Sequence, residues 1–434
     1  MRLLSTSGSS APVTFRDALL EGLAPDGGLY LPDRIPAFTA AGLAALRGTP
    51  LADVATTVLG SLAGDEFDPA RFDALVRDAF NFPAPTVALG GGLSVLELFH
   101  GPTLAFKDFG ARFLARVFGH LLEQRGDHAT VLVATSGDTG SAVAQGFFGV
   151  PRVQVVVLYP AGKVSPFQEA QMATLGGNVR AVRVPGTFDD CQRLVKQAFV
   201  DPGLRALRLS SANSINIGRL LPQAVYYFHS HQAAAPGGGP VVFAVPSGNL
   251  GNLTAGVIAQ RAGLPVKRFV TACNVNDVLP EYLRTGQYRA RPAVATISNA
   301  MDVGDPSNFA RLAALHDGSW ERLRENVAGY RVTEDETRAA IRRVHDASGY
   351  VLDPHGAVGV AAAWRYQEDT GEAAPIVSLA TAHPAKFGAV IREELGFEPE
   401  LPEHYRDWAS RPVLAATLDD TAYESFRRWL LALV

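Results

Sequence analysis

A unit of strand followed by helix recurs through most of the chain and constrains its fold most strongly. Short apolar, β-branched runs occupy 129–135, 152–160, 178–186, 240–246 and 375–381, and each run leads into a segment with helical character. Strands that alternate with helices in this way predict βαβ units and a parallel sheet with helices on both faces. We therefore expect an α/β fold with open, mostly parallel sheets flanked by helices.

Segments outside this pattern indicate how the chain divides. The first residues contain turns and short expected helices, such as 71–80, which predicts an added N-terminal domain. The stretch AAAPGGGP at 233–240 is typical of a linker or long loop, and the capping box Thr333-x-x-Glu336 predicts a helix that ends near residue 348. The expected domains are an N-terminal domain (1–93), a smaller α/β domain (131–236) and a larger α/β domain (94–130 with 237–434).

Composition excludes several classes of function. The 434 residues carry a formal net charge of -4, which gives no reason to expect nucleic acid or an anionic membrane as a partner. No apolar run is long enough to span a membrane, and no signal-peptide-like segment begins the chain. Cys191 and Cys273 are far apart, and the pair His229 and His231 lacks a further ligand at matching spacing, so we expect no metal site. A cytoplasmic protein is the expectation.

Two related glycine-rich loops follow expected strands. TSGDTG (135–140) and PSGNLGN (246–252) both contain Ser-Gly-[Asp/Asn]-x-Gly. In open α/β sheets, ligands bind at the carboxyl ends of strands, where glycines let backbone N–H groups converge on an anion. The second loop is the better phosphate cradle, because Asp138 in the first loop would repel a dianion. Neither loop contains the Walker A, GxSxG or GxGxxG pattern.

Lys107 is the other chemical feature. It stands in HGPTLAFKDFGARFLARVF (100–118), between Leu104-Ala105-Phe106 and an apolar run that starts at Phe109. A buried ammonium is costly unless it is paired or loses its charge, and a lysine in an apolar pocket is suited to form a Schiff base. Taken alone, the stretch also fits a partly exposed lysine at a helix start.

The lysine, the cradle and a third strand end together suit pyridoxal phosphate. The aldehyde would meet Lys107, the phosphate would meet the 247–252 loop, and the pyridine nitrogen would meet the hydroxyl of Thr381. Such a cofactor explains a lysine among apolar residues, because the working form of that lysine is an imine rather than a free ammonium.

Eight segments then carry a resemblance to a known family. They are FRDALLEGLAPDGGLYLP (15–32), ELFHGPTLAFKDFG (97–110), ATSGDTGSA (134–142), GKVSPFQEAQM (162–172), SSANSINIGRLLPQ (210–223), VPSGNLGNLTAG (245–256), SNAMDVGDPSNFAR (298–311) and LATAHPAKF (379–387). In this order they resemble the threonine synthases of the microbial long-chain type, within the fold type II (tryptophan synthase β-like) pyridoxal-phosphate enzymes. LAPDGGLYLP and AMDVGDPSNF are the stretches most particular to threonine synthases.

The resemblance implies a fold type II architecture and roles for individual residues toward pyridoxal phosphate. Lys107 would form the Schiff base and then carry protons, Thr381 would face the pyridine nitrogen, and Asp138 would lie beside the 3-oxygen of the cofactor. The residues that would hold the cofactor phosphate are Ser247, Gly248, Asn249, Leu250, Gly251 and Asn252. A carboxylate at position 138, where related enzymes have Asn, needs a proton or a nearby cation, and the sequence leaves open which it has.

The resemblance also implies the substrate, O-phospho-L-homoserine, which reacts with water to give L-threonine and phosphate. Thr135, Ser136 and Thr139 would contact the substrate carboxylate. The residues expected at the substrate phosphate are Lys163 and Arg219 as cations, with Ser165, Asn213 and Asn216 as donors. Surface ion pairs are the alternative role for both cations.

Three other functions stay open. A threonine-synthase-like phospholyase would release 2-ketobutyrate, and a related dehydratase would act on serine or threonine. A non-catalytic paralogue would bind pyridoxal phosphate without turnover. The expected assembly is a monomer or a homodimer.

Overall fold

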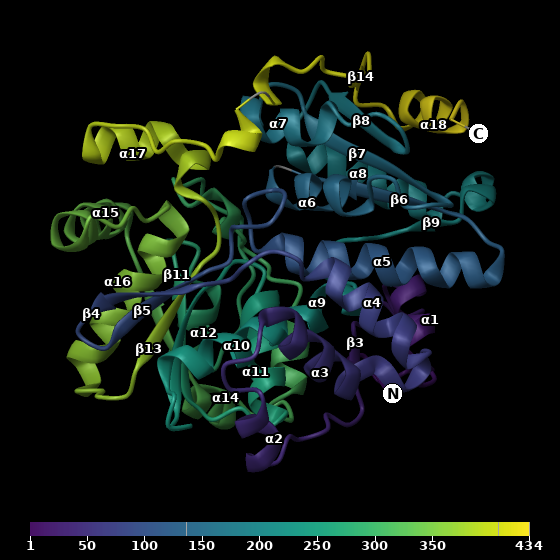
Figure 1. Ribbon diagram of the computed structural model, residues 1–434. Helices are drawn as coiled ribbons and strands as arrows, with labels where there is room; N and C mark the ends of the chain where they lie inside the picture. The colour runs from purple at the N-terminus through teal and green to yellow at the C-terminus, as the bar shows by residue number, and fades with distance from the viewer. Residues whose placement is uncertain (136, 407, 434) are drawn as a thin grey trace.

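The computed structural model describes residues 1–135, 137–406 and 408–433. Two mostly parallel sheets dominate it, and each has helices on both sides (Figure 1). The larger sheet has the strand order β12-β11-β10-β13-β5-β4. Its strands are β4 (Thr86–Gly90), β5 (Leu93–Glu97), β10 (Val241–Pro246), β11 (Val266–Cys273), β12 (Val327–Arg331) and β13 (Ile376–Ala380). The predicted α/β class with open, mostly parallel sheets is confirmed.

The six-stranded sheet is parallel except at one edge. There β4 and β5 pair antiparallel, because Gly90, Gly91 and Gly92 make a tight turn in which all three have positive φ values, 94°, 59° and 77°. This hairpin was not predicted from the sequence.

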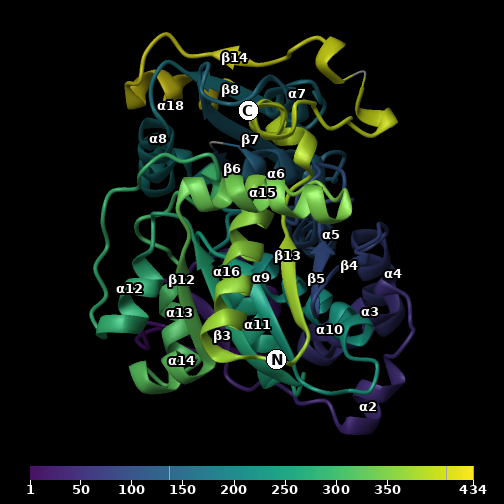
Figure 2. The same cartoon turned by 90° about the vertical axis from the view of Figure 1, so that its left-hand side faces the viewer.

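Burial on both faces explains the continuous apolar runs that predicted these strands. Along β10, Val241, Phe243 and Val245 enter one apolar core, while Val242 and Ala244 enter another. Helix α16 (Pro354–Thr370) covers the second face, as Figure 2 shows, and helices α10 (Ala224–Ala234) and α11 (Gly251–Arg261) lie on the first. A strand covered on both sides alternates between two cores rather than between core and water.

The smaller sheet is parallel throughout and has the order β14-β8-β7-β6-β9. Its strands are β6 (Ala129–Ala134), β7 (Val153–Pro160), β8 (Val179–Val184), β9 (Leu209–Ser210) and β14 (Ala416–Thr417). Helices α6 (Asp138–Phe147), α7 (Pro166–Ala173) and α8 (Phe188–Val200) follow β6, β7 and β8 in turn. The strands expected at 129–135, 152–160, 178–186, 240–246 and 375–381 are confirmed, with small shifts at their ends.

Helix α5 (Lys107–Arg125) lies between the smaller sheet and the N-terminal part of the chain. It packs against α6 on one side and α4 (Pro69–Ala79) on the other. The N-terminal part has a three-stranded antiparallel sheet, β2-β1-β3, beside short helices. Its elements are β1 (Arg2–Ser5), β2 (Val13–Thr14), β3 (Tyr30–Pro32), α1 (Phe15–Glu21), α2 (Ala40–Ala45) and α3 (Leu51–Ala63).

The remaining helices connect and cover these sheets. They are α9 (Ile217–Leu220), α12 (Val278–Thr285), α13 (Phe309–Ala314), α14 (Trp320–Asn326), α15 (Glu334–Ser348), α17 (Gly388–Leu395) and α18 (Tyr423–Leu431). The predicted capping box of α15 is present, with Thr333 and Glu336 bonded reciprocally. No helix in the described ranges is both long and apolar enough to cross a membrane.

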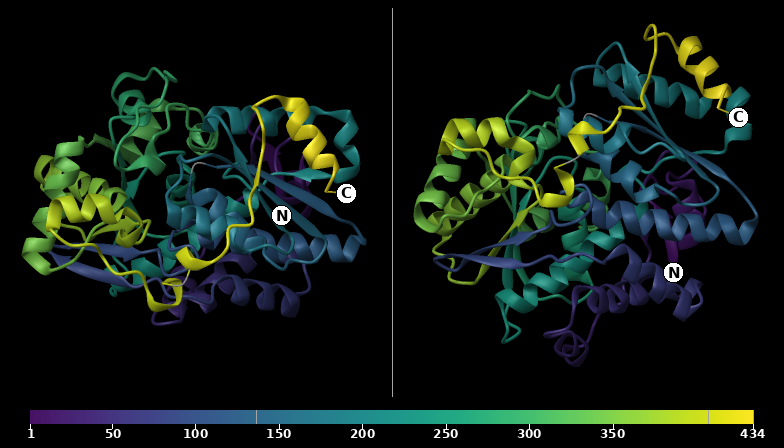
Figure 3. Two further views of the ribbon diagram at one scale, coloured as in Figure 1. Left: turned by 90° about the horizontal axis from the view of Figure 1, so that it is seen from above. Right: turned by 45° about the horizontal axis from the view of Figure 1, so that its top comes forward.

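The division into domains stays a proposal, and sheet membership differs from the expected limits at two places. Strand β4, inside 1–93, pairs with β5 of the larger sheet, because the glycine turn folds it back. After α17 the chain crosses to the other half of the molecule, where β14 pairs with β8 and α18 packs on α8 (Figure 3). Residues 416–431 therefore pack with the smaller sheet, although the expected larger domain (94–130 with 237–434) included them.

Candidate active site

Lys107 is the first residue of α5, and the turn before it is held against the end of β13. The backbone N–H of Phe106 donates to the carbonyl oxygen of Thr381 at 2.9 Å. Leu104 is buried with a φ of 56°, a left-handed conformation that is uncommon for a leucine. Tertiary contacts therefore fix this turn and make Lys107 and Thr381, two predicted site residues, close neighbours.

The amine of Lys107 is confined. Its side chain is 17% exposed, and Nζ lies 5.0 Å from the centre of the Phe106 ring and 3.8 Å from Oδ2 of Asp138. Burial lowers the pKa of Lys107, Asp138 opposes that shift, and the charges of Lys386 and Arg219 add to it. A lysine with a lowered pKa offers more of the neutral amine that attacks a carbonyl.

Asp138 lies closer to a second lysine than to Lys107. Nζ of Lys386 lies 2.5 Å from Oδ1 of Asp138, and the Lys386 side chain is 1% exposed. The amide of Gln168 donates to the same oxygen at 3.1 Å. Burial alone would raise the pKa of Asp138, but Lys386 and Lys107 outweigh burial and hold the pKa well below its usual range. The carboxylate is therefore ionised, and Lys386 is the nearby cation that it needs.

Lys386 is a site residue that was not predicted from the sequence. This lysine lies in the short 3-10 turn Pro384–Phe387, which follows β13 and Thr381 directly. Its Nζ also donates to the carbonyl oxygen of Thr103 at 3.0 Å, in the loop that leads to Lys107. The available signal was its position, because a basic residue just beyond the carboxyl end of a strand is placed where ligands bind.

The second glycine-rich loop connects β10 to α11. Leu250 has a φ of 60°, and Gly251 begins α11, where first-turn N–H groups have no helical acceptor. Asn252 is 6% exposed, and its Oδ1 accepts from the hydroxyls of Tyr226 at 2.7 Å and Tyr227 at 2.8 Å. Its buried Nδ2 has no hydrogen-bond partner among the residues that the structure describes. A phosphate oxygen would supply the missing acceptor, so the loop fits the cofactor phosphate.

A later segment packs behind this loop. A Cβ on Gly248 would lie 2.9 Å from the carbonyl oxygen of Ala300, so no larger residue fits there without a backbone shift. The amide oxygen of Asn249 accepts from the N–H of Ser307 at 2.6 Å, and its carbonyl accepts from the amide of Asn308 at 3.0 Å. Ser247 turns its hydroxyl back to the strand, donating to Val245 at 2.8 Å. The segment 298–311 is therefore the support of the predicted phosphate loop.

The first glycine-rich loop connects β6 to α6. The hydroxyl of Thr135 donates to the carbonyl of Gly137 at 2.9 Å and accepts from the N–H groups of Gly137 at 3.0 Å and Gly140 at 2.9 Å. These bonds use its whole hydrogen-bonding capacity, so Thr135 holds the loop rather than a ligand. Asp138 takes the first position of α6, where the helix dipole favours a carboxylate. Thr139 is half-buried, and Ser136 lies outside the described residues.

Arg219 is a buried cation beside α5. It is 4% exposed, and its Nη1 donates to the carbonyl of Ala212 at 2.6 Å. Its buried Nε has no partner within the described ranges, and burial lowers its pKa to about 10. A Cβ on Gly110 of α5 would lie 3.2 Å from that Nε. An unpaired guanidinium N–H of this kind is suited to bind an anion.

The two predicted asparagine donors differ. The amide of Asn216 donates to Leu19 at 2.9 Å and Ser211 at 3.2 Å, and its Oδ1 accepts from Gly218 at 2.9 Å. The oxygen of Asn216 therefore caps α9, while both amide hydrogens are used by backbone carbonyls, so no donor remains for a substrate. Asn213 is half-buried, and we keep it as a candidate.

Lys163 and Ser165 lie at the start of α7. Ser165 caps that helix and accepts from the N–H of Gln168 at 3.2 Å. Because Gln168 also binds Asp138, this helix start adjoins the site. Lys163 is exposed in the preceding turn.

Arg311 is a buried residue whose guanidinium binds three separate segments around the site. It is fully buried and donates to the carbonyl oxygens of Tyr30 at 3.0 Å, Ser214 at 3.3 Å and Ile215 at 2.6 Å. It also donates to Oδ1 of Asn308 at 2.9 Å, and burial lowers its pKa to about 9. The two sequence stretches that most strongly carried the resemblance, 23–32 and 300–309, are therefore joined through this guanidinium.

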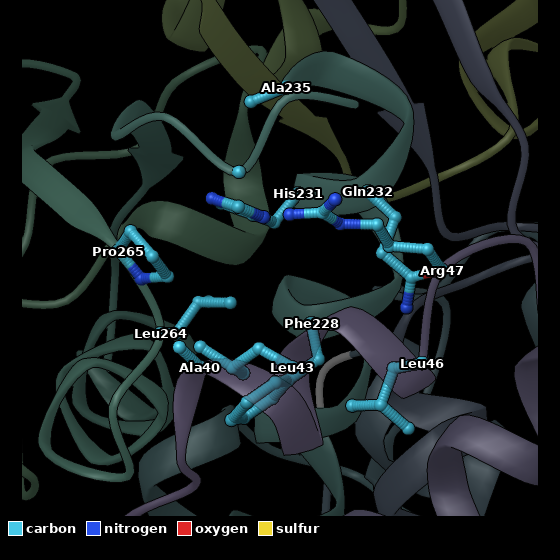
Figure 4. Close-up of a pocket in the computed structure, with 11 residues that line it drawn as sticks. Ala40, Leu43, Leu46, Arg47, Phe228, His231, Gln232, Ala235, Leu264 and Pro265 are labelled. Atoms are coloured by element: carbon cyan, nitrogen blue, oxygen red, sulfur yellow. The ribbon is translucent and has the colours of Figure 1, made fainter.

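A separate cavity of about 120 Å³ lies between α2 and α10 (Figure 4). Its lining has apolar residues such as Leu43 and Phe228 and the polar residues Arg47, His231 and Gln232. It includes none of the predicted site residues. Across the described residues, no three His, Cys, Asp or Glu side chains gather as a metal site requires.

Comparison with known families and proteins agrees with this site. The family described as pyridoxal-phosphate dependent enzyme matches residues 82–382. The families described as threonine synthase N terminus and threonine synthase, C-terminal match residues 2–80 and 356–428.

Similar proteins cover the whole chain. It is 43% identical to the threonine synthase of Haemophilus influenzae over 99% of this chain and 100% of that protein, and 43% identical to that of Escherichia coli over 96% of each. A crystal structure of pyridoxal-phosphate-bound threonine synthase from Brucella melitensis superposes with a TM-score of 0.95 at 41% identity, covering 99% of this chain and 98% of that one. Threonine synthase from yeast gives 0.92 at 33% identity, covering 100% and 99%.

Proposed function

The chain belongs to the threonine synthase family of pyridoxal-phosphate-dependent enzymes, and from this membership we propose that it converts O-phospho-L-homoserine and water to L-threonine and phosphate. It is a pyridoxal-phosphate-dependent lyase of fold type II. When bound, the cofactor supplies an aldehyde that captures an amine and a ring that draws electrons from the substrate α-carbon.

Lys107 carries the chemistry in this proposal. Its amine is the attachment point of the cofactor and, once released, takes the α-proton of the substrate and returns protons to the carbon skeleton. Phe106 covers part of the Lys107 side chain, which is only 17% exposed, and this limits the access of bulk water to that amine. Thr381 would present a neutral hydroxyl to the pyridine nitrogen.

Other residues hold the two anionic groups. Backbone N–H groups of 247–252 and the free Nδ2 of Asn252 bind the cofactor phosphate. Arg219 binds the substrate phosphate through its unpaired Nε, helped by Asn213, Ser165 and the exposed Lys163.

The first glycine-rich loop orients the substrate carboxylate in this proposal. Its N–H groups, Ser136 and Thr139 would contact that carboxylate, and Asp138 would lie beside the 3-oxygen of the cofactor. Thr135 keeps the loop in shape through its three bonds to the loop backbone.

The observation that carries this proposal is the placement of the Lys107 amine, 3.8 Å from a carboxylate that another lysine already neutralises. The test has two stages. The purified chain is incubated with pyridoxal phosphate, reduced with borohydride and digested, and the added mass is expected on Lys107. Phosphohomoserine is then supplied, and phosphate and threonine are expected in equal amounts.

Lys107→Ala should abolish turnover, and Lys267→Ala, which removes an exposed lysine paired with Glu372, is the matched control. Release of phosphate with 2-ketobutyrate would identify a phospholyase instead. Cofactor binding without phosphate release would identify a non-catalytic paralogue, and turnover in Lys107→Ala would remove the mechanism.

We further propose a cytoplasmic location and a monomeric or homodimeric state. Two free, buried cysteines, Cys191 and Cys273, support a reducing compartment. Size-exclusion chromatography with light scattering distinguishes the two assemblies.

A further inference from the structure

Three charged side chains form a line in the site, and their spacing is unequal. Asp138 lies 2.5 Å from Lys386 and 3.8 Å from Lys107, through its two different carboxylate oxygens. The Lys386 side chain is almost completely buried, whereas that of Lys107 is 17% exposed. The closer ion pair of Asp138 is therefore with the lysine that the proposed reaction does not use.

Lys386 is fixed in this place by contacts other than Asp138. Its Nζ donates to the carbonyl oxygen of Thr103 at 3.0 Å, and Gln171 donates to that same oxygen at 3.1 Å. The hydroxyl and N–H of Thr103 in turn bind Asp108, both at 2.7 Å. A long lysine side chain is normally mobile, but this one has a buried stem, a carbonyl and a carboxylate to hold it.

We propose that Lys386 is a positioning residue that takes up the charge of Asp138 and thereby leaves Lys107 free to lose its proton. This inference rests on the proposed function, in which Lys107 must be a neutral amine before it can capture the cofactor. A carboxylate with Lys107 as its sole counter-ion would hold the proton on Lys107. With Lys386 in place, the positive charge of Lys386 also repels a proton from Lys107.

Four charged side chains from different parts of the fold act on Lys107. Asp138 on α6 and Asp108 on α5 favour the charged amine, while Lys386 after β13 and Arg219 on α9 disfavour it. Lys386 differs from the others because its removal favours the charged form of Lys107 in two ways. The loss frees Asp138 to pair with Lys107 and removes a repelling charge.

The test measures the protonation of Lys107 without cofactor or turnover. The full chain, freed of pyridoxal phosphate, is labelled with trace acetic anhydride across a pH series, and the acetylation of Lys107 is read by peptide mass spectrometry. Lys386→Met should raise the pH midpoint of Lys107 by about one unit or more. Uptake of pyridoxal phosphate at pH 7, followed by visible absorbance, should slow about tenfold, because one unit is a tenfold change in neutral amine.

Matched variants separate charge from packing. Lys386→Arg keeps the charge and should keep the midpoint near that of the wild type. In Asp138→Asn with Lys386→Met, both charges are gone, and the midpoint should return toward the wild-type value. Lys267→Met removes a lysine from a different ion pair, with Glu372 at 2.7 Å, and should leave Lys107 unchanged.

An unchanged midpoint in Lys386→Met, or an equal rise in the double variant, would overturn the inference. Should Lys386→Met fail to fold, Asp138→Asn alone decides, because Lys386 then repels Lys107 without a counter-ion and the midpoint must fall. A rise in Asp138→Asn counts against the inference. Failure of the proposed function is seen separately, as absence of pyridoxal phosphate on Lys107 in the wild-type chain.

Discussion

The guanidinium of Arg311 donates a 3.0 Å hydrogen bond to the carbonyl oxygen of Tyr30, which lies 281 residues earlier in the chain. With its bonds to Ser214, Ile215 and Asn308, this buried cation joins the N-terminal sheet to the segment just before α9 and to the support of the phosphate loop. Within the part of the chain that the structure describes, none of its acceptors is a carboxylate, so carbonyl dipoles solvate the charge.

Arg311→Met should lower the free energy of unfolding by about 3–5 kcal/mol, because it leaves several buried carbonyl groups without donors. Urea unfolding followed by fluorescence measures this loss. Arg34→Met, at an exposed position in the same N-terminal region, is the control and should change the free energy by less than about 0.5 kcal/mol. Equal small effects in both variants would show that the buried guanidinium contributes little.

Gly248→Ala should weaken pyridoxal phosphate about tenfold or more, which is about 1.4 kcal/mol. The added Cβ would meet the carbonyl oxygen of Ala300 and the Cα of Met301, both at 2.9 Å, and these backbone atoms cannot turn aside. Titration of the cofactor by absorbance gives the affinity. Gly239→Ala, where a Cβ meets nothing within 4 Å, is the matched control and should bind like the wild type. Wild-type affinity in Gly248→Ala would contradict the assignment of the cradle.

Arg219→Ala should raise the KM for phosphohomoserine about a hundredfold, the value of a charge-assisted hydrogen bond to phosphate, and change cofactor affinity much less. Steady-state kinetics and cofactor titration on the same preparation test this split. Arg219→Lys keeps the charge without the planar donor set and should fall between the two. Equal losses for substrate and cofactor would assign Arg219 to structure alone.

Asp108 should make part of the stability depend on pH. Burial raises the pKa of Asp108 to about 6, although bonds from Thr103 oppose the shift. Because the folded pKa is above the unfolded value of about 3.9, the contribution is complete below pH ~4 and is lost as pH rises through 6. The free energy of unfolding of the wild type, less that of Asp108→Asn, should fall by up to about 3 kcal/mol between pH 4 and 7. Urea unfolding at several pH values gives this difference, and a rise with pH would show that the folded pKa is depressed instead.

Local signals predicted the parts of the fold that local physics determines. The helix at 334–348 began where Thr333 and Glu336 satisfy each other's backbone groups, and the run 129–135 formed β6 because burial on both faces favours uninterrupted β-branched residues. The pairing of β14 with β8 joins distant segments through only a few backbone bonds, and no pattern in either segment predicts it.

The site residues also differ in how far the sequence predicted them. Lys107 and the two glycine-rich loops have distinctive neighbours in the sequence, so they could be selected. Lys386 is marked in the sequence only by its position beyond the end of a strand, and its importance comes from a 2.5 Å approach to Asp138 that only the tertiary structure creates. Asn216 was chosen as a donor, but its amide donates to the backbone of Ser211 and of Leu19, 197 residues earlier, which a residue type alone does not reveal.

The return of the chain to the smaller sheet has a consequence for synthesis. Arg193 of α8 donates to the carbonyl oxygen of Thr421, 228 residues later, and Phe426 and Leu430 complete the apolar cluster that contains Leu194. At a translation rate of about 5–20 residues per second, a nascent chain carries an uncovered α8 for roughly 10–45 s. Ribosome-bound chains that stop before residue 416 should therefore expose this patch to chaperones, and the smaller half should close only after the last segment emerges.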